Sequence, residues 1–178
     1  MDLKQLRNDP AAWHILEERA RALMIQDAAA TTEHGDACLT FRLGDGGYSI
    51  PAQFIREVQP LGDYTPLPNT PAFVVGLVSV RGRLIAVLDL RPLLDLPQTP
   101  LQANAFLLIL TVNGTEVGLL ADVVVEVRRN TDVLTPAPST TAGHGVAWVR
   151  GVDRDLTLRL DPPALVADSR LIVNVAAH

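Results

Sequence analysis

An internal repeat constrains the fold of this chain more than any other feature of its sequence. The matched pairs, at shifts of 69 or 70 residues, are Leu39 with Leu108, Phe41 with Leu110, Glu57-Val58 with Glu126-Val127, Arg81-Gly82 with Arg150-Gly151, and 65–68 with 135–138. Hydrophobic residues make up 48% of the chain, so apolar matches alone carry little weight, unlike matched charged dipeptides and Thr-Pro-x-Pro segments. Two units are too few for a solenoid. The repeat therefore predicts two similar lobes, about 38–100 and 105–166.

The spacing of apolar residues inside each unit predicts strands. Apolar and polar residues alternate from Leu39 to Leu43, and Asp45-Gly46-Gly47 is typical of a hairpin turn. Further strands are expected over 77–80, 83–89, 106–112, 116–120, 123–129, 148–152 and 156–160. Short strands separated by turns favour an all-β fold of small antiparallel barrels. The residues expected inside the barrels or at their join are Leu39, Phe41, Ile50, Leu84, Val87, Leu108, Leu110, Leu119, Leu158 and Leu160.

The segments that flank this module differ from it. Residues 1–37 predict an N-terminal amphipathic helix, capped by Asp9 and Pro10, and a polar linker. The helix has an apolar stripe of Trp13, Leu16, Ala20 and Leu23, which either packs on the module itself or recruits a second partner. Residues 167–178 form a tail, whose stretch 171–175 either adds a strand or pairs with a partner.

The residues needed for catalysis are not grouped in this sequence. The four histidines are scattered, and none forms a metal-ligand spacing with another on one predicted element. Asp153 and Asp155 form the tightest carboxylate pair, which is expected to be a solvated turn. The single cysteine, Cys38, excludes an internal disulfide. We therefore expect no enzyme, no cofactor and no metal site.

The net charge of −5 disfavours nucleic-acid and anionic-membrane surfaces, which need clustered Lys and Arg. A single-strand nucleic-acid binder is the alternative of another class, because small barrels host that function. Its stacking aromatics would have to be Trp13, Tyr48, Tyr64 and Trp148, which are dispersed. The start lacks a signal-peptide pattern, and no apolar run reaches the roughly 18 residues of a membrane helix. The expected location is the cytoplasm.

The stretch from Gly76 to Arg91, GLVSVRGRLIAVLDLR, closely resembles the signature of CheW-like domains. In that pattern Ser79 stands where the family usually has Asn. Supporting stretches lie at 48–51, 55–58, 66–68, 118–122 and 149–152. The resemblance covers residues 38–166 with its order intact.

The resemblance implies a fold and a function. The fold is two five-stranded, SH3-like barrels packed across a shared apolar seam, without catalytic activity or cofactor. The function is that of an adaptor in bacterial chemotaxis, which joins the cytoplasmic tips of methyl-accepting chemoreceptors to the regulatory domain of a CheA-type histidine kinase. An adaptor of a pilus-motility or developmental signalling array remains an alternative within the family.

The expected binding site is an apolar groove near the join of the lobes, flanked by Ile55, Val78 and Ile85, which would accept the helical tip of a receptor. Ser79 and the Arg81-Gly82 turn lie beside it in the sequence.

Two ion pairs are expected as well. Glu57 precedes Arg81 by 24 residues, and Glu126 precedes Arg150 by the same number. This equal spacing predicts that each Glu faces its Arg. The first pair would then fix the Arg81-Gly82 turn beside the groove.

Overall fold

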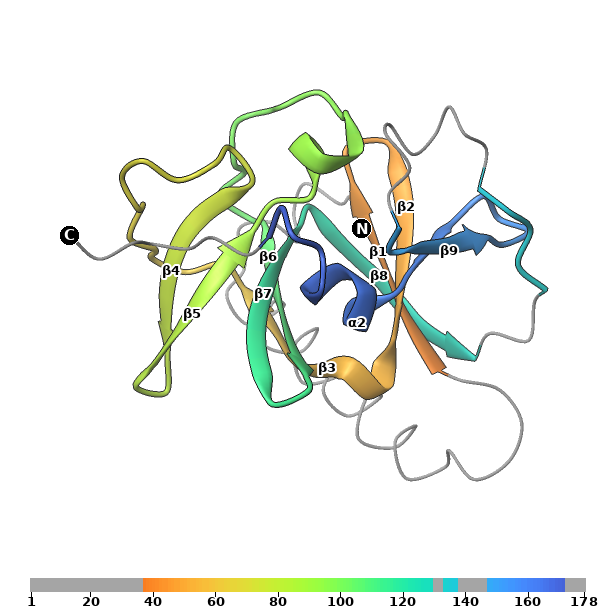
Figure 1. The fold of residues 1–178 in the computed structure, drawn as a ribbon, viewed down its shortest axis with the longest axis horizontal. Helices are drawn as coiled ribbons and strands as arrows, with labels where there is room; N and C mark the ends of the chain where they lie inside the picture. Colours follow the sequence, from red (N-terminus) through yellow and green to blue (C-terminus); the bar gives the residue numbers. More distant parts are fainter. Residues whose placement is uncertain (1–36, 130–132, 138–146, 172–178) are drawn as a thin grey trace, which may run out of the picture.

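The structure is a computed structural model that describes residues 37–129, 133–137 and 147–171. These residues form two five-stranded sheets with very little helix (Figure 1). Sheet A has the order β8-β1-β2-β10-β9 and contains β1 (Ala37–Leu43), β2 (Gly46–Pro51), β8 (Val123–Arg129), β9 (Val149–Val152) and β10 (Leu158–Leu160). Sheet B has the order β3-β6-β7-β5-β4 and contains β3 (Ile55–Pro60), β4 (Val74–Val80), β5 (Arg83–Leu88), β6 (Phe106–Val112) and β7 (Thr115–Ala121). The predicted all-β fold is confirmed, whereas the predicted N-terminal helix lies outside the described residues.

Each sheet combines strands from both halves of the chain. The hairpin β1–β2 is completed by β8, β9 and β10, and the hairpin β6–β7 is completed by β3, β4 and β5. The contiguous lobes predicted over 38–100 and 105–166 therefore do not coincide with the sheets. The chain leaves sheet A after β2 through the short 3-10 helix η2 (Ala52–Phe54), and β3 then pairs with β6 of the other half.

The strand registers confirm the 69-residue repeat. Leu39 lies opposite Ile50 in β1–β2, and Leu108 lies opposite Leu119 in β6–β7. The pairs β2–β10 and β5–β7 are parallel, so the sheets are not wholly antiparallel as expected. Isolated bridges from the segments that follow β3 and β8 bring these segments against β4 and β9, respectively. These bridges draw the two edges of each sheet together.

The repeat shifts by six further residues between β4 and β9. Gly76 and Gly151 have φ angles of 152° and 157°, and a Cβ would lie 2.4 Å from the carbonyl oxygen of Thr65 at Gly76 and 2.6 Å from that of Thr135 at Gly151. Both positions exclude a side chain because another backbone approaches them. The counterpart of Gly151 is therefore Gly76 and not Gly82, and the predicted match of Arg81-Gly82 with Arg150-Gly151 is wrong.

A large apolar cluster, here called the seam, contains side chains from both sheets. Nine of the ten residues expected in the interior are buried in the structure. The exception is Leu84, whose side chain is 71% exposed. Strand β5 alternates, and its neighbours Ile85 and Val87 point into a second, smaller cluster inside sheet B. Leu84 therefore faces away from that cluster.

The segment after β10 packs against the seam. Helix α2 (Pro162–Val166) begins at Asp161, whose carboxylate accepts the backbone N–H of Ala164. The buried Trp148 donates its indole N–H to Asp168 Oδ2 at 3.0 Å. Hydrogen bonds from Arg170, opposed by burial and assisted by Trp148, lower the pKa of Asp168 to about 2. These contacts fix the segment that follows α2.

Candidate functional site

The predicted site residues that reach the surface gather at one end of sheet B, where β3 begins and the β4–β5 hairpin turns. Arg81 Nη2 lies 3.3 Å from Glu57 Oε2, so the predicted pair of these residues is confirmed. The Arg81 side chain is 62% exposed, and that of Glu57 is largely covered. An exposed pair of this kind contributes about 0–1 kcal/mol to stability. The pair holds the Arg81 guanidinium beside the Glu57 carboxylate.

The Arg81-Gly82 turn has backbone angles that do not suit an arginine. Val80 pairs with Arg83, and the two residues between them have φ of 50° and 79°. Two positive φ values define a type I′ hairpin loop, for which Asn-Gly is preferred. The turn between β6 and β7 has nearly the same φ values, 50° and 80°, and it does have that sequence, Asn113-Gly114. Arg81 therefore occupies a position that turn chemistry would give to Asn.

A second ion cluster lies at the same end of sheet B. Glu116 on β7 binds Arg56 on β3 and Arg83 on β5, the latter at 2.8 Å between Nη1 and Oε2. Sequence reasoning missed these three residues, because only the strand register brings them together. With Arg81 and Glu57, three arginines face two glutamates, which leaves one excess positive charge in a chain of net charge −5.

The predicted pair of Glu126 and Arg150 is wrong. Arg150 instead binds Asp161, with 2.8 Å between Nε and Oδ2. Because Gly151 is the twin of Gly76, Arg150 lies within strand β9 rather than in a hairpin turn. The equal spacing of 24 residues in the two halves was therefore a coincidence of sequence.

The three apolar residues expected to flank a binding groove are buried instead. Ile55 is 9% exposed, Val78 is 4% and Ile85 is 2%. Ile55 belongs to the seam, whereas Val78 and Ile85 belong to the cluster inside sheet B. These residues thus pack the interior and are not available to a partner. Of the predicted site, Ser79, Arg81 and Gly82 are exposed.

A buried arginine connects the two sheets. Arg91 lies in the 3-10 helix η3 (Arg91–Leu94) and donates to Asp89 at 3.0 Å and to Thr99 at 2.7 Å. Its Nη1 lies 3.8 Å from Asp122, which also accepts the backbone N–H of Gly44 in the β1–β2 hairpin. Burial opposes the charge of Arg91, but the hydrogen bond and charge of Asp89 and the charge of Asp122 raise its pKa. The final Asp-Leu-Arg of the Gly76–Arg91 stretch thus holds η3 to the other sheet.

The inside of sheet A carries mostly polar residues at positions where the inside of sheet B is apolar. Cys38 and Thr40 of sheet A correspond in the repeat to Leu107 and Ile109 of sheet B. In the same way, Asp153 corresponds to Val78, Thr157 to Ile85 and Arg159 to Val87.

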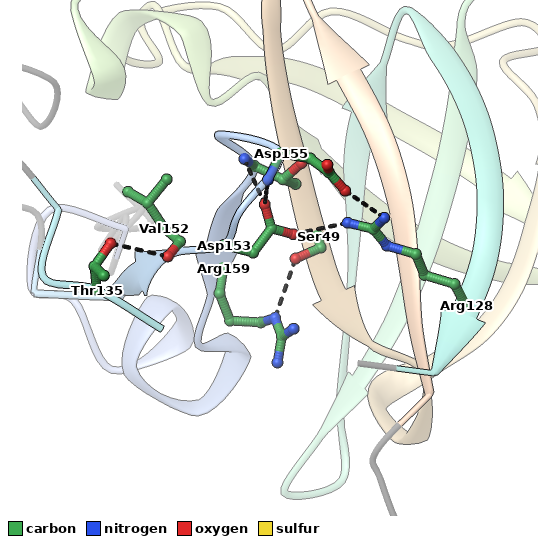
Figure 2. A network of polar contacts seen from close by, with 8 residues as sticks. Ser49, Arg128, Thr135, Val152, Asp153, Asp155 and Arg159 are labelled. Carbon is green, nitrogen blue, oxygen red and sulfur yellow. Dashed lines mark hydrogen bonds and ion pairs between the residues drawn. The ribbon is translucent and has the colours of Figure 1, made fainter. Parts of the chain in front are cut away.

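Figure 2 shows the resulting network. Asp153 accepts backbone N–H groups of Asp155 and Thr157 and a 2.8 Å hydrogen bond from Arg128, while Arg159 donates to Ser49. Asp153 is buried, so its expected role as a solvated turn residue is wrong. These contacts order the β9–β10 connection.

The described residues can be searched for a metal site and for a membrane-spanning helix. Among them, no group of three or more His, Cys, Asp and Glu side chains could hold a metal ion. None of their helices is long and apolar enough to cross a membrane. This part of the chain presents an exposed arginine turn paired with Glu57, and an ion cluster around Glu116, at one end of sheet B.

The family follows from comparison with known proteins. The model of the CheW-like domain matches residues 37–170, and the chain belongs to this family. The chemotaxis protein CheW of Rhizobium meliloti is 26% identical over 130 residues, which cover 72% of this chain and 84% of that protein. Protein FrzA of Myxococcus xanthus is 34% identical over 98 residues, 54% of this chain and 61% of FrzA. The scaffolding protein TtCheW of Thermoanaerobacter tengcongensis has a similar fold, with a TM-score of 0.64 and 23% identity over 72% of this chain and 90% of TtCheW.

Proposed function

We propose that this protein is a non-catalytic adaptor that couples the cytoplasmic tips of chemoreceptors to a CheA-type histidine kinase. Membership of the CheW-like family supports this function, as do the relatives named as chemotaxis proteins CheW. The adaptor would act in the cytoplasm and join membrane receptors only through its partners. It would need no cofactor.

The Arg81-Gly82 turn is the observation that carries the proposal to particular residues. An L-residue other than Asn or Asp in the left-handed region costs roughly 1–2 kcal/mol. The exposed pair with Glu57 returns at most about 1 kcal/mol. Arg81 therefore does not serve the fold, and its exposed guanidinium is available to hydrogen-bond a partner. Ser79, on the same hairpin, would line the same contact.

The test is charge reversal at this pair. Glu57→Arg and Arg81→Glu should each reduce the amount of kinase that cosediments with receptor-bearing membranes in the presence of the adaptor. The double reversal should recover part of it, because the oriented pair is restored with opposite polarity. Additive losses without recovery would show that the two residues act separately.

A matched control exists in the other sheet. Arg150 and Asp161 form an ion pair whose side chains are 65% and 17% exposed, close to the 62% and 13% of Arg81 and Glu57. Reversing Arg150 alone, which leaves Asp161 as the N-cap of α2, should leave cosedimentation unchanged. An equal loss would mean that reversal harms the fold or the net charge distribution rather than a partner contact. Identifying the kinase that the protein captures from lysate separates flagellar chemotaxis from a pilus-motility or developmental array.

A further inference from the structure

Strand β8 forms one edge of sheet A and carries exposed apolar side chains. Among the described strands it pairs only with β1. Val123 and Val125 of this strand are 47% and 52% exposed. An exposed edge strand presents unpaired backbone N–H and C=O groups, which can bind another strand. The edge of sheet A at β8 is therefore a candidate for strand pairing with a second protein chain.

The equivalent edge of sheet B is protected against such pairing. Strand β3 is the repeat counterpart of β8, with Arg56 at the position of Val125 and Pro60 at that of Arg129. Arg56 is charged and binds Glu116, and Pro60 has no backbone N–H to donate. Charged residues and prolines keep edge strands from pairing. Strand β8 has no proline, and an exposed valine replaces the charge of Arg56.

The charges on β8 favour a second copy of the same strand as the partner. Glu126 is exposed, and none of the ion pairs between described residues includes it. Two residues further along, Arg128 lies on the same face of the strand, and its side chain is 31% exposed. Opposite charges that face each other across two antiparallel strands stabilise the pair. A strand that carries both signs on one face can therefore pair with an inverted copy of itself.

Symmetry and charge together select one register. When a two-fold axis relates two antiparallel strands of one sheet, a residue at the axis lies opposite its own copy. Glu126 at the axis would oppose two carboxylates, and Arg128 or Arg129 there would oppose two guanidinium groups. With Val127 at the axis, Glu126 lies opposite Arg128 twice. Val125 then lies opposite Arg129, so like charges do not face each other in this register.

We propose that two copies of this chain associate through antiparallel pairing of their β8 strands, with Val127 at the two-fold axis. The two copies of sheet A would then form one continuous sheet. The contact involves one short strand from each copy, so the dimer is expected to be weak and in exchange with the monomer. The proposal does not depend on the adaptor function.

Sedimentation velocity of the full chain over a range of concentrations measures the association. The native chain should reach a monomer–dimer equilibrium by about 0.1 mM. Val125→Lys should raise the dissociation constant of the dimer by roughly tenfold or more, because it places a positive charge opposite Arg129 of the copy. Leu156→Lys is the matched control, since Leu156 is 81% exposed in the β9–β10 connection of the same sheet, and it should leave the association unchanged.

Three results would overturn the proposal. The first is a native chain that stays monomeric at this concentration, whatever else covers the edge of β8. The second is a dimer that Val125→Lys does not weaken. The third is an equal weakening by Leu156→Lys, which would attribute the effect to added charge rather than to β8.

Disulfide formation between molecules tests the register. A chain with Val125→Cys is mixed with a chain with Arg129→Cys, because the proposed register places these two positions opposite each other. The mixed disulfide should form roughly tenfold faster, or more, than the disulfide of either variant with itself, and equal rates would overturn the register. Both positions are exposed, so the strands should be retained, which circular dichroism checks. The native Cys38 is 1% exposed and stays in place.

Discussion

Replacing Arg81 by Asn should make the protein more stable and a poorer adaptor. The turn at Arg81 and Gly82 has two positive φ angles, and Asn occupies the first such position with roughly 1 kcal/mol less strain than Arg. The substitution loses the exposed ion pair with Glu57, which is worth about 0–1 kcal/mol. The net change is therefore a gain of about 0–1 kcal/mol. Cosedimentation of the kinase with receptor-bearing membranes should fall nonetheless, because the substitution removes the Arg81 guanidinium that is proposed to contact a partner.

The assay is urea unfolding beside cosedimentation of kinase with receptor-bearing membranes. With a slope of about 1–3 kcal/mol per molar urea, a gain of 1 kcal/mol moves the midpoint upwards by roughly 0.3–1 M. Asn113→Arg in the β6–β7 turn is the matched control, since Asn113-Gly114 has φ of 50° and 80°, close to the angles of Arg81-Gly82. It should lower the midpoint by a similar amount and leave cosedimentation unchanged.

One result would refute this reasoning. If Arg81→Asn lowers the free energy of unfolding by more than about 1 kcal/mol while Asn113→Arg does the same, turn strain is not what distinguishes the two positions. Normal cosedimentation by Arg81→Asn would remove Arg81 from the binding surface.

Three further predictions concern stability. Arg91→Met should cost about 3–5 kcal/mol, because it leaves the carboxylates of Asp89 and Asp122 without their buried cation; a loss below 1 kcal/mol in urea unfolding would contradict this. The lowered pKa of Asp168, about 2, means that its contribution is complete above the unfolded pKa near 4 and is lost as the pH falls towards 2. The urea midpoint should therefore drop more between pH 4.5 and 2.5 in the native chain than in Asp168→Asn, and equal drops would disprove it. Thr40→Val should be neutral or stabilising by up to about 1 kcal/mol, because Thr40 Oγ1 is buried without a hydrogen-bond partner in the described structure; thermal unfolding that shows a clear loss would indicate a partner.

The sequence predicted the strands and the repeat because both depend on local patterns. Alternation from Leu39 to Leu43 and its echo at Leu108 required no knowledge of the fold, and their registers agree in the structure. The combination of strands from both halves of the chain in each sheet was not predictable in this way. Hydrophobic patterning does not determine whether β3 pairs with β1 or with β6. That choice is made by long-range packing.

The site was partly predictable for a similar reason. Glu57 and Arg81 were found because a charged pair recurred near a turn, but the same reasoning failed for Arg150, which lies in a strand and binds Asp161. Val78 and Ile85 are apolar residues of alternating strands and pack in the cluster inside sheet B, and sequence alone could not distinguish such an interior position from the wall of a groove. The cluster around Glu116 depends entirely on register.

The exchange of strands also sets an order for assembly during synthesis. Sheet B needs only β3 to β7 and has its last strand once residue 121 has left the ribosome. The first hairpin of sheet A, β1–β2, is synthesised before any strand of sheet B, but sheet A is complete only after β10, which ends at Leu160. Until then the apolar face of β1–β2 lacks its own sheet. Sheet B is complete at that stage and contributes the other part of the seam, so the apolar face of the β1–β2 hairpin can pack against it before β8, β9 and β10 are added.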